Sequence, residues 1–185
     1  NELHLLTIDE DTGKFKVPDY VAGLDGGSDK IAYIEDDIAV SDKHVGALVL
    51  KGAYVGGSGK LTIGNDKGNA YLVFDADSNG SATQITGGKN VYFGAARGYV
   101  LSGAAVGNNS TGGSINGYIN GSGGVVFCSQ YNGGIALYRK QKYTGDTRVL
   151  GGVVLMTGTD SYKGDFGNGK VYVVGGEYTG GSVRF

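Results

Sequence analysis

The chain is short of the residue types that most often build cofactor, metal and membrane sites. Its 185 residues include one Cys, one Pro, one Met, two His and no Trp. The lone Cys128 excludes an intramolecular disulfide framework and a zinc site made of cysteines. No apolar run approaches the roughly 18 residues of a transmembrane helix, and no signal peptide is present. Because the chain starts at Asn1 rather than Met, we expect a processed product or a piece of a longer polypeptide.

Glycine, by contrast, is abundant, with 37 residues. Glycine costs more backbone entropy in a helix than other residues do, so this content excludes a helical bundle or a doubly wound α/β enzyme. Disorder is disfavoured because 40% of the residues are hydrophobic and 10% aromatic. The single Pro and the lack of a three-residue glycine period exclude collagen. An all-β fold with frequent turns remains.

Short apolar bursts separated by glycines mark the expected strands. No segment has a sustained 3.6-residue period, so we expect no helix. The predicted strands from residue 46 onward include 47–50, 61–63, 70–74, 91–93, 125–127, 153–156 and 171–174.

Charge divides the chain after residue 45. Residues 1–45 contain 11 of the 18 acids and 4 of the 16 Lys and Arg, a formal charge of −7, and residues 46–185 carry +5. We therefore expect an acidic, less regular N-terminal β segment or cap over 1–45 and a glycine-rich repeat over 46–185, in one continuous domain. Within the first part, residues 4–8, 31–34 and 37–40 are expected as strands paired in hairpins, with the acids on a solvated face.

An internal repeat indicates how the strands are arranged. Segment 47–58 matches segment 171–182 as a strand, a glycine step, a Tyr and Gly-Gly-Ser. Such units are too small to bury their own apolar faces, and stacking them would bury a shared core and align the Tyr rings. The alternative is chance recurrence in a chain rich in Gly and Tyr. A Tyr followed two residues later by Gly, and then by Gly or Asp, occurs at Tyr54, Tyr131, Tyr143, Tyr162 and Tyr178.

Residues 134–155 resemble a known family, the passenger-associated repeat of bacterial autotransporters. A partial second match lies at Tyr178 and Gly180, and Arg139, Lys140 and Lys142 depart from the family pattern. The acidic first 45 residues show no resemblance. The positions that match are Tyr143, Gly145, Thr147, Val149, Gly152 and Leu155.

The resemblance implies a right-handed parallel β-helix, secreted through the outer membrane of a Gram-negative bacterium and located at the cell surface or released. It implies a structural stalk or adhesin scaffold that supports folding and secretion, with a surface receptor or glycan as partner and neither nucleic acid nor cofactor. The family's membrane barrel is not found in this sequence. The alternative, from another class, is a β-solenoid that binds or degrades polysaccharide, as tail spikes and lyases do.

One segment has the opening of a calcium loop. Asp75, Asp77 and Asn79 are followed by Gly80, an Asp-x-Asp-x-Asn-Gly pattern in which hard oxygens converge. The twelfth position is Thr86 instead of a bidentate Glu, so the pattern favours an Asx turn over a metal site.

The sequence has no recognisable catalytic constellation. His4 and His44 are the only imidazole bases, both lie in the acidic segment, and no Gly-x-Ser-x-Gly elbow is present. Asp66, Asp146 and Asp165 fall in glycine turns, which indicates turn chemistry.

A basic cluster is the remaining candidate site. Two tyrosines, Tyr138 and Tyr143, interleave with it, which suits acidic glycans or nucleic acid, although the solvated face of a strand is the commoner explanation. Cys128 is expected to be a small buried hydrophobe. The cluster consists of Arg139, Lys140, Lys142 and Arg148.

Overall fold

The computed structural model describes residues 7–8, 15–16, 20–66, 68–75, 83–103, 111–129, 134–156, 164–174 and 182–184. These residues form strands and turns without a helix, so the all-β prediction is confirmed. In this part of the chain there is accordingly no helix suited to crossing a membrane.

The described strands form three parallel sheets and one small antiparallel pair, β1 (Thr7–Ile8) with β2 (Phe15–Lys16). The eight-stranded sheet contains β3 (Tyr20–Ala22), β4 (Ile31–Ile34), β7 (Ala47–Lys51), β10 (Asn69–Asp75), β13 (Arg97–Ser102), β16 (Val125–Ser129), β18 (Thr147–Gly151) and β20 (Val171–Val173). The seven-stranded sheet contains β5 (Ile38–Ala39), β8 (Tyr54–Gly56), β11 (Gln84–Ile85), β14 (Thr111–Ile115), β17 (Gly134–Leu137), β19 (Val153–Met156) and β21 (Ser182–Arg184). The four-stranded sheet contains β6 (Lys43–Val45), β9 (Lys60–Ile63), β12 (Asn90–Tyr92) and β15 (Ile119–Asn120).

The chain visits the three sheets in a repeating order, and we call one such pass a rung. The first full rung is β4, β5 and β6, and the next is β7, β8 and β9. Each strand pairs in parallel with the corresponding strand of the next rung. Ile31 aligns with Ala47, Ala47 with Tyr71 and Tyr71 with Tyr99, so these rungs hold 16, 24 and 28 residues. Parallel sheets visited in turn are consistent with a solenoid-like fold.

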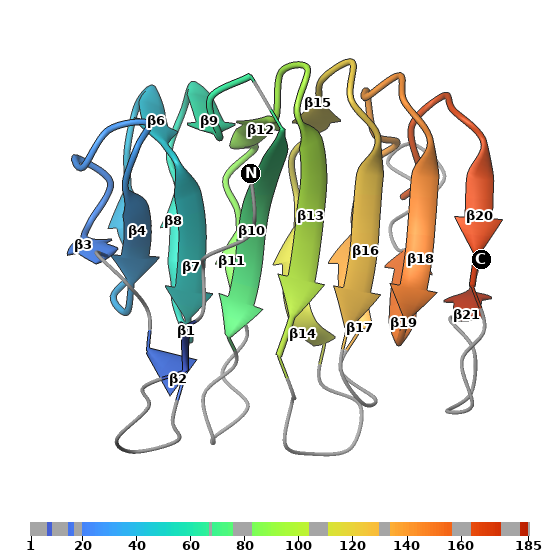
Figure 1. Ribbon diagram of the computed structural model, residues 1–185, viewed down its shortest axis with the longest axis horizontal. Helices are drawn as coiled ribbons and strands as arrows, with labels where there is room; N and C mark the ends of the chain where they lie inside the picture. The colour runs from blue at the N-terminus through green and yellow to red at the C-terminus, as the bar shows by residue number, and fades with distance from the viewer. Residues whose placement is uncertain are drawn as a thin grey trace.

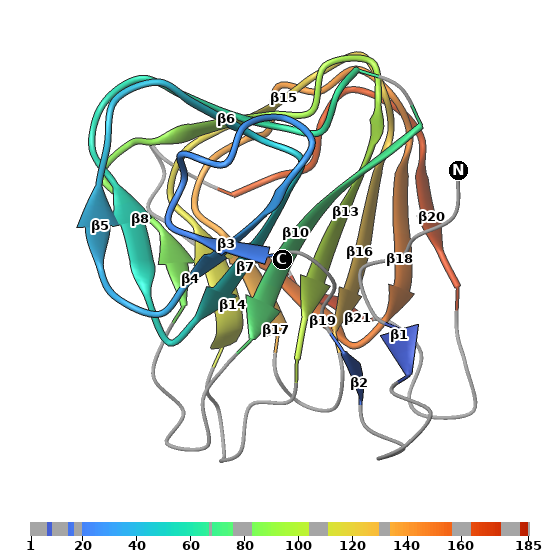
Figure 2. The ribbon, with the colours of Figure 1, turned by 60° about the vertical axis from the view of Figure 1, so that its left-hand side comes forward.

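Figures 1 and 2 show how the sheets are arranged. The eight-stranded sheet lies across the front of Figure 1, with its strands side by side in chain order from left to right. The four-stranded sheet runs along the top, and the seven-stranded sheet lies behind. In Figure 2, β5 and β8 of the seven-stranded sheet form the left side of the molecule. The three sheets therefore enclose a common interior.

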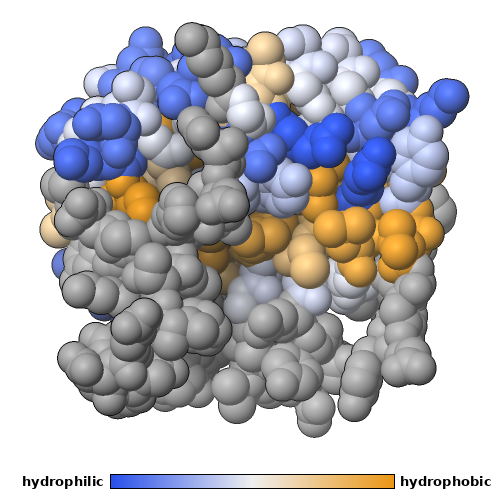
Figure 3. All heavy atoms as spheres, viewed as in Figure 1, coloured by the Kyte–Doolittle hydropathy of each residue, from blue (hydrophilic) through white to orange (hydrophobic). Residues whose placement is uncertain are grey.

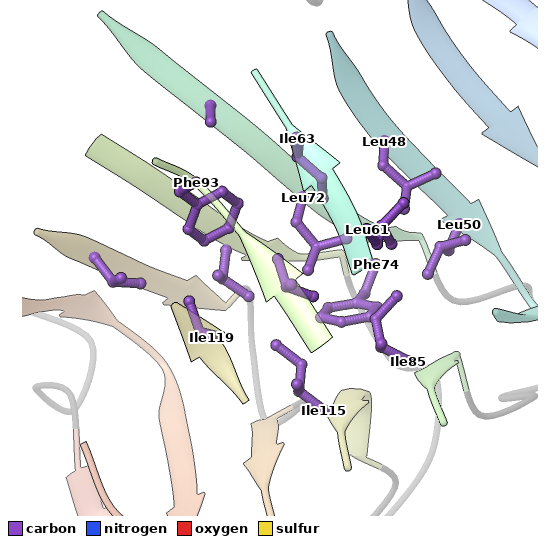
Figure 4. Packing of buried hydrophobic residues seen from close by; sticks show 14 of the residues in the cluster. Leu48, Leu50, Leu61, Ile63, Leu72, Phe74, Ile85, Phe93, Ile115 and Ile119 are labelled. Atoms are coloured by element: carbon purple, nitrogen blue, oxygen red, sulfur yellow. The ribbon is translucent and has the colours of Figure 1, made fainter. Parts of the chain in front are cut away.

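Alternation within each strand builds the core in that interior. In β4 and β13, buried and partly exposed residues alternate along the strand, as expected for a strand with one face inside. Side chains from all three sheets meet in the middle, as Figure 4 shows for Leu72, Leu61 and Ile85. These three side chains have 0% exposure. The core is thus shared between rungs, and no rung has a core of its own.

Two glycines inside strands make room for core phenylalanines. A Cβ placed on Gly113 of β14 would lie 2.2 Å from the Phe74 ring, and one on Gly98 of β13 would lie 2.1 Å from the Phe93 ring. Neither glycine has a positive φ. Their role is therefore space for a ring rather than a turn, and this role was not expected from the sequence.

Side chains at the corners tie neighbouring rungs together. Asp37 Oδ1 accepts a hydrogen bond from the Tyr54 N–H at 2.8 Å, and Asp42 Oδ1 accepts one from the Lys60 N–H at 2.6 Å. In a later rung, Asp146 Oδ1 accepts from the Lys170 N–H at 2.9 Å. Turn acids thus satisfy backbone donors of the following rung in addition to facing solvent.

The strand predictions from residue 46 onward are confirmed at every segment named above. The hairpin prediction is wrong for residues 31–34 and 37–40, because β4 and β5 pair in parallel with the next rung. Near residues 4–8, β1 pairs with β2 in the antiparallel manner of a hairpin. The division of the chain at residue 45 stays a prediction.

The match between segments 47–58 and 171–182 holds only in part. Both begin in the eight-stranded sheet. We call residues that strand pairing aligns from one rung to the next a row. Ala47 is in the same row as Tyr172, one residue from the predicted Val171. Tyr54 belongs to the row that ends at Arg184, so the predicted match of Tyr54 with Tyr178 is wrong. Rungs differ in length between sheets, so equal sequence spacing does not give equal position.

Candidate functional site

Two lysine–tyrosine pairs lie next to each other on the outer face of the four-stranded sheet. Lys60 Nζ lies 4.6 Å from the centre of the Tyr92 ring, and Lys142 Nζ lies 3.9 Å from the centre of the Tyr118 ring. Tyr92 and Tyr118 belong to successive rungs, since Val91 aligns with Ile119. By rung, the order along the stack is therefore Lys60, Tyr92, Tyr118 and Lys142, with Tyr92 aligned with Asn120, two residues along from Tyr118. We call these four residues the Lys–Tyr surface.

The buried residues next to these side chains set their direction. Leu61, Val91 and Ile119 have 0% exposure and point inward, so each neighbour in the strand points outward. Gln141 continues the inward row, and its Oε1 accepts the Ile119 N–H at 2.6 Å. The Lys142 N–H donates to the Ile119 carbonyl at 2.9 Å, which places Lys142 beside Tyr118. The Lys–Tyr surface is therefore held by backbone pairing.

Further cations adjoin the Lys–Tyr surface. Arg139 donates from Nε to the Asn116 carbonyl at 2.9 Å, with its guanidinium carbon 5.7 Å from the Tyr118 ring centre. Lys140 is exposed and forms a backbone bridge with Asp165. Among the described residues the recorded ion pairs are Lys43 with Asp25 and Lys51 with Glu35, so neither Lys60 nor Lys142 is neutralised by a carboxylate there.

The structure divides the basic cluster predicted from the sequence. Arg148 lies in the eight-stranded sheet, with its guanidinium carbon 5.6 Å from the Tyr172 ring centre, and so leaves the cluster. Tyr143 is fully buried and does not interleave with the cations. Tyr118, from the preceding rung, takes that place. Sequence reasoning missed Tyr118, Tyr92 and Lys60. Each is next to a buried residue of a short strand, and this alternation is the sequence feature that could have indicated an outward side chain.

Two residues of the Tyr-x-Gly-x-Thr segment, Tyr143 and Thr147, are buried and bonded to each other. The Tyr143 hydroxyl and Thr147 Oγ1 are hydrogen-bonded at 2.6 Å, and both residues have 0% exposure. A Cβ on Gly145 would lie 2.5 Å from the backbone of Gly123 and Gly124 in the preceding rung, so only glycine allows this approach. Burial raises the pKa of Tyr143 to about 12, with the Thr147 hydrogen bond acting in the opposite direction.

The other predicted repeat residues do not join this pair in the described part of the chain. Tyr54 begins β8 in the seven-stranded sheet and is half-buried. Tyr131, Tyr162, Tyr178 and Gly180 lie outside the described residues. The alignment of the Tyr rings along one edge therefore stays a prediction for these positions, whereas Tyr54 lies in the seven-stranded sheet and Tyr143 in the core.

The predicted calcium turn is described only at its first residue. Asp75 ends β10 and lies opposite Lys51 of β7; Asp77 and Asn79 lie outside the described residues. Burial raises the pKa of the Asp75 carboxyl, and the nearby Lys51 charge lowers it. Within the described residues no three His, Cys, Asp or Glu side chains are placed to hold a metal ion. The calcium turn stays a prediction.

Several titratable side chains in short strands and their connections contact the backbone. His44 Nε2 lies 2.6 Å from the Gly64 carbonyl oxygen, and His4 falls outside the described residues. Asp66 is in a turn with φ of 60°. The Phe166 N–H donates to Asp165 Oδ1 at 2.8 Å. Asp66 and Asp146 lie in the connections that precede β10 and β18, as the sequence indicated, whereas Asp165 forms a backbone bridge with Lys140 and does not lie in a glycine turn.

A buried lysine links three rungs. Lys89 has 0% exposure, and its Nζ donates to the Val40 carbonyl at 2.6 Å and the Ser58 carbonyl at 2.7 Å. A third bond goes to the Ser41 carbonyl. Burial lowers the pKa of Lys89, with the Asp42 charge acting in the opposite direction. The ammonium is satisfied by carbonyl oxygens, which makes it a structural crosslink.

The outer face of the eight-stranded sheet is a second, apolar surface. Figure 3 shows a hydrophobic band across this face with hydrophilic residues above it. Tyr71 and Tyr99 stack there with ring centres 5.1 Å apart. Cys128 lies on this outward side and is half-buried, so the prediction of a buried core residue is only partly right, because Cys128 alternates with the inward Phe127. Burial raises the pKa of the Cys128 thiol.

Comparison of the chain with protein-family models, with curated proteins and with solved structures finds no match. The class that the fold defines is thus an all-β protein of parallel sheets.

Proposed function

We propose that this chain is a β-helical segment of an autotransporter-type passenger, a structural stalk or adhesin scaffold exposed at the cell surface or secreted. The observation that carries the proposal is the stacking of parallel rungs around a continuous core. Such a stack extends a chain over a long distance with contacts only between neighbouring rungs. It suits a spacer that must hold a binding region away from a membrane.

A right-handed course of the helix is part of the proposal. Connections between parallel strands of one sheet are right-handed in about 98% of cases, and each rung is such a connection. The arrangement of Tyr143, Gly145 and Thr147 also supports the proposal, because these three residues are among the positions that match the passenger-associated repeat. Close rung contact at these residues would favour ordered folding after export.

Surface exposure on intact cells tests the proposed location. An antibody against this chain is applied to bacteria that produce the parent polypeptide, before and after permeabilisation of the outer membrane. We expect labelling of intact cells. Labelling that appears only after permeabilisation, together with that of a periplasmic marker, would contradict the proposal.

The variant Gly145→Val tests the folding role. A side chain at this position meets the backbone of Gly123 and Gly124, so rung stacking should weaken, and the ratio of surface-exposed to total protein should fall. Thr144→Ala changes the exposed neighbour and serves as the matched control. An unchanged ratio for Gly145→Val would count against the folding role.

A second candidate function, polysaccharide binding or degradation, is favoured by one observation. The outer face of the four-stranded sheet presents exposed lysines over half-buried tyrosine rings, and cationic side chains suit sugar ligands that carry acidic groups. A degrading enzyme would also need converging carboxylates in a groove. Activity on a panel of glycans distinguishes this function from a stalk.

A further inference from the structure

The Lys–Tyr surface has the chemistry of a binding site for a polyanion. Lys60 and Lys142 lie at its two ends, with Tyr92 and Tyr118 between them. Adjacent strands are about 4.8 Å apart, so the four rungs span roughly 15 Å along the stack. This length accommodates several sugar units of an extended chain.

We propose that the Lys–Tyr surface binds an acidic polysaccharide laid along the axis of the stack. The inference rests on the geometry of this face, and it applies whether the chain is a stalk or a free glycan-binding protein. Carboxylate or sulfate groups would contact the ammonium groups of Lys60 and Lys142. Tyr92 and Tyr118 would position these ammonium groups through the cation–π contacts that each ring makes with its lysine.

The charge distribution supports an anionic ligand. Lys60, Lys140 and Lys142 are exposed, and each is free of an ion pair in the part of the chain that the structure describes. Acidic residues lie at the margins: Asp42 at one end, with Oδ1 engaged by the Lys60 N–H, and Asp165 beyond Lys140 at the other. A cationic strip with acidic margins attracts a linear anion and aligns it.

The aromatic geometry favours a glycan over a nucleic acid. Proteins that bind single strands use uncovered aromatic faces on which bases stack. In this surface a lysine lies over each ring, and an Arg139 guanidinium is also near Tyr118. The cations thus occupy ring surface that bases would need, and they are positioned to meet anionic groups at the ring edges.

Binding of the purified chain to defined polymers tests the proposal. Heparin and polygalacturonate serve as sulfated and carboxylated probes, dextran as a neutral one, and single-stranded DNA as the competing polyanion. We expect both acidic polysaccharides to bind, with affinity falling as salt is raised, and dextran not to bind. The double variant Lys60→Ala/Lys142→Ala should weaken binding about fivefold or more, given the typical worth of exposed charge contacts.

A control at a lysine outside the Lys–Tyr surface separates this surface from general attraction. Lys51→Ala removes a lysine from the eight-stranded sheet and should leave binding unchanged. Circular dichroism checks that all variants are folded. Absence of binding, equal losses for Lys51→Ala and the double variant, or tighter binding of DNA than of both glycans would each overturn the proposal. Since the cell-labelling test of the stalk does not depend on glycan binding, the two proposals can fail separately.

Discussion

At the residue scale, Tyr143, the first position that matches the passenger-associated repeat, lies in the interior of the stack. Its hydroxyl bonds Thr147 Oγ1 inside the stack, and Gly145 between them allows the preceding rung to approach. The sequence identified these residues as a motif and expected the Tyr to stand on an edge. The structure makes the ring part of the core, because Tyr143 points inward between the exposed residues Lys142 and Thr144.

Alkaline pH should expose the contribution of Tyr143 to stability. Its folded-state pKa of about 12 lies above the usual 10, so the folded state holds the proton more tightly. The resulting stability is complete below pH 10 and is lost as the pH rises from 10 towards 12, by up to about 3 kcal/mol. Urea unfolding of the wild type and of Tyr143→Phe at pH 9 and pH 11 measures this loss.

The Phe variant keeps all the other tyrosines and therefore isolates this ring. Between pH 9 and pH 11 the wild type should lose about 1 kcal/mol more than Tyr143→Phe does. Equal losses in the two proteins would show that the Tyr143 pKa is not raised by burial.

At the scale of elements, side chains at the corners connect neighbouring rungs, as the strands do. Asp42 and Asp146 were expected on a solvated face or in turns, and each accepts a backbone N–H of the following rung. Lys89 does the reverse, donating to carbonyls of two earlier corners. Short-range patterns cannot reveal such bonds, since the partners lie 18 to 49 residues apart.

Replacing Lys89 should loosen three rungs at once. Lys89→Met keeps the aliphatic length but leaves the carbonyls of Val40, Ser41 and Ser58 without a donor. We expect a loss of about 2–4 kcal/mol in the free energy of unfolding, from the cost of unpaired buried polar groups. Urea denaturation measures it. Lys60→Met, the same change at an exposed position in β9, should shift it by less than about 0.5 kcal/mol.

A loss for Lys89→Met no greater than that for Lys60→Met would mean that the carbonyl contacts of Lys89 do not stabilise the stack. The comparison is direct because both variants remove one positive charge and add one thioether.

At the scale of the whole molecule, stability should vary along the stack. Leu72 in β10 lies between rungs on both sides and has 0% exposure, whereas Val173 in the edge strand β20 is 49% exposed. Both face inward in the same row. Each rung is stabilised mainly by its neighbours, so the edge rung should open more readily.

Amide hydrogen exchange measures this gradient. Amides of β10 and β13 should be protected far more than those of β20, by about tenfold or more if opening costs differ by about 1.4 kcal/mol. Uniform protection across the sheet would indicate that the molecule opens as one cooperative unit.

The sequence by itself determined the all-β class and the positions of many of the strands. Glycine content and short apolar bursts predicted an all-β chain, and strands such as β7, β10 and β16 lie where those bursts are. These features could be predicted because alternation and turn preference act within a few residues. β14 was not among the predicted strands, since Gly113 leaves it little apolar character.

Only the tertiary structure decided which distant residues meet. Rungs hold 16 to 28 residues, and their lengths determine which residues strand pairing aligns. As a result, Lys142 contacts Tyr118, and Arg148 lies in another sheet. Tyr54 is likewise separated from Tyr143. The space for the Phe74 ring likewise depends on which strand comes beside it. The physical reason is that corner length fixes strand register, and corner length carries no periodic signal in the sequence.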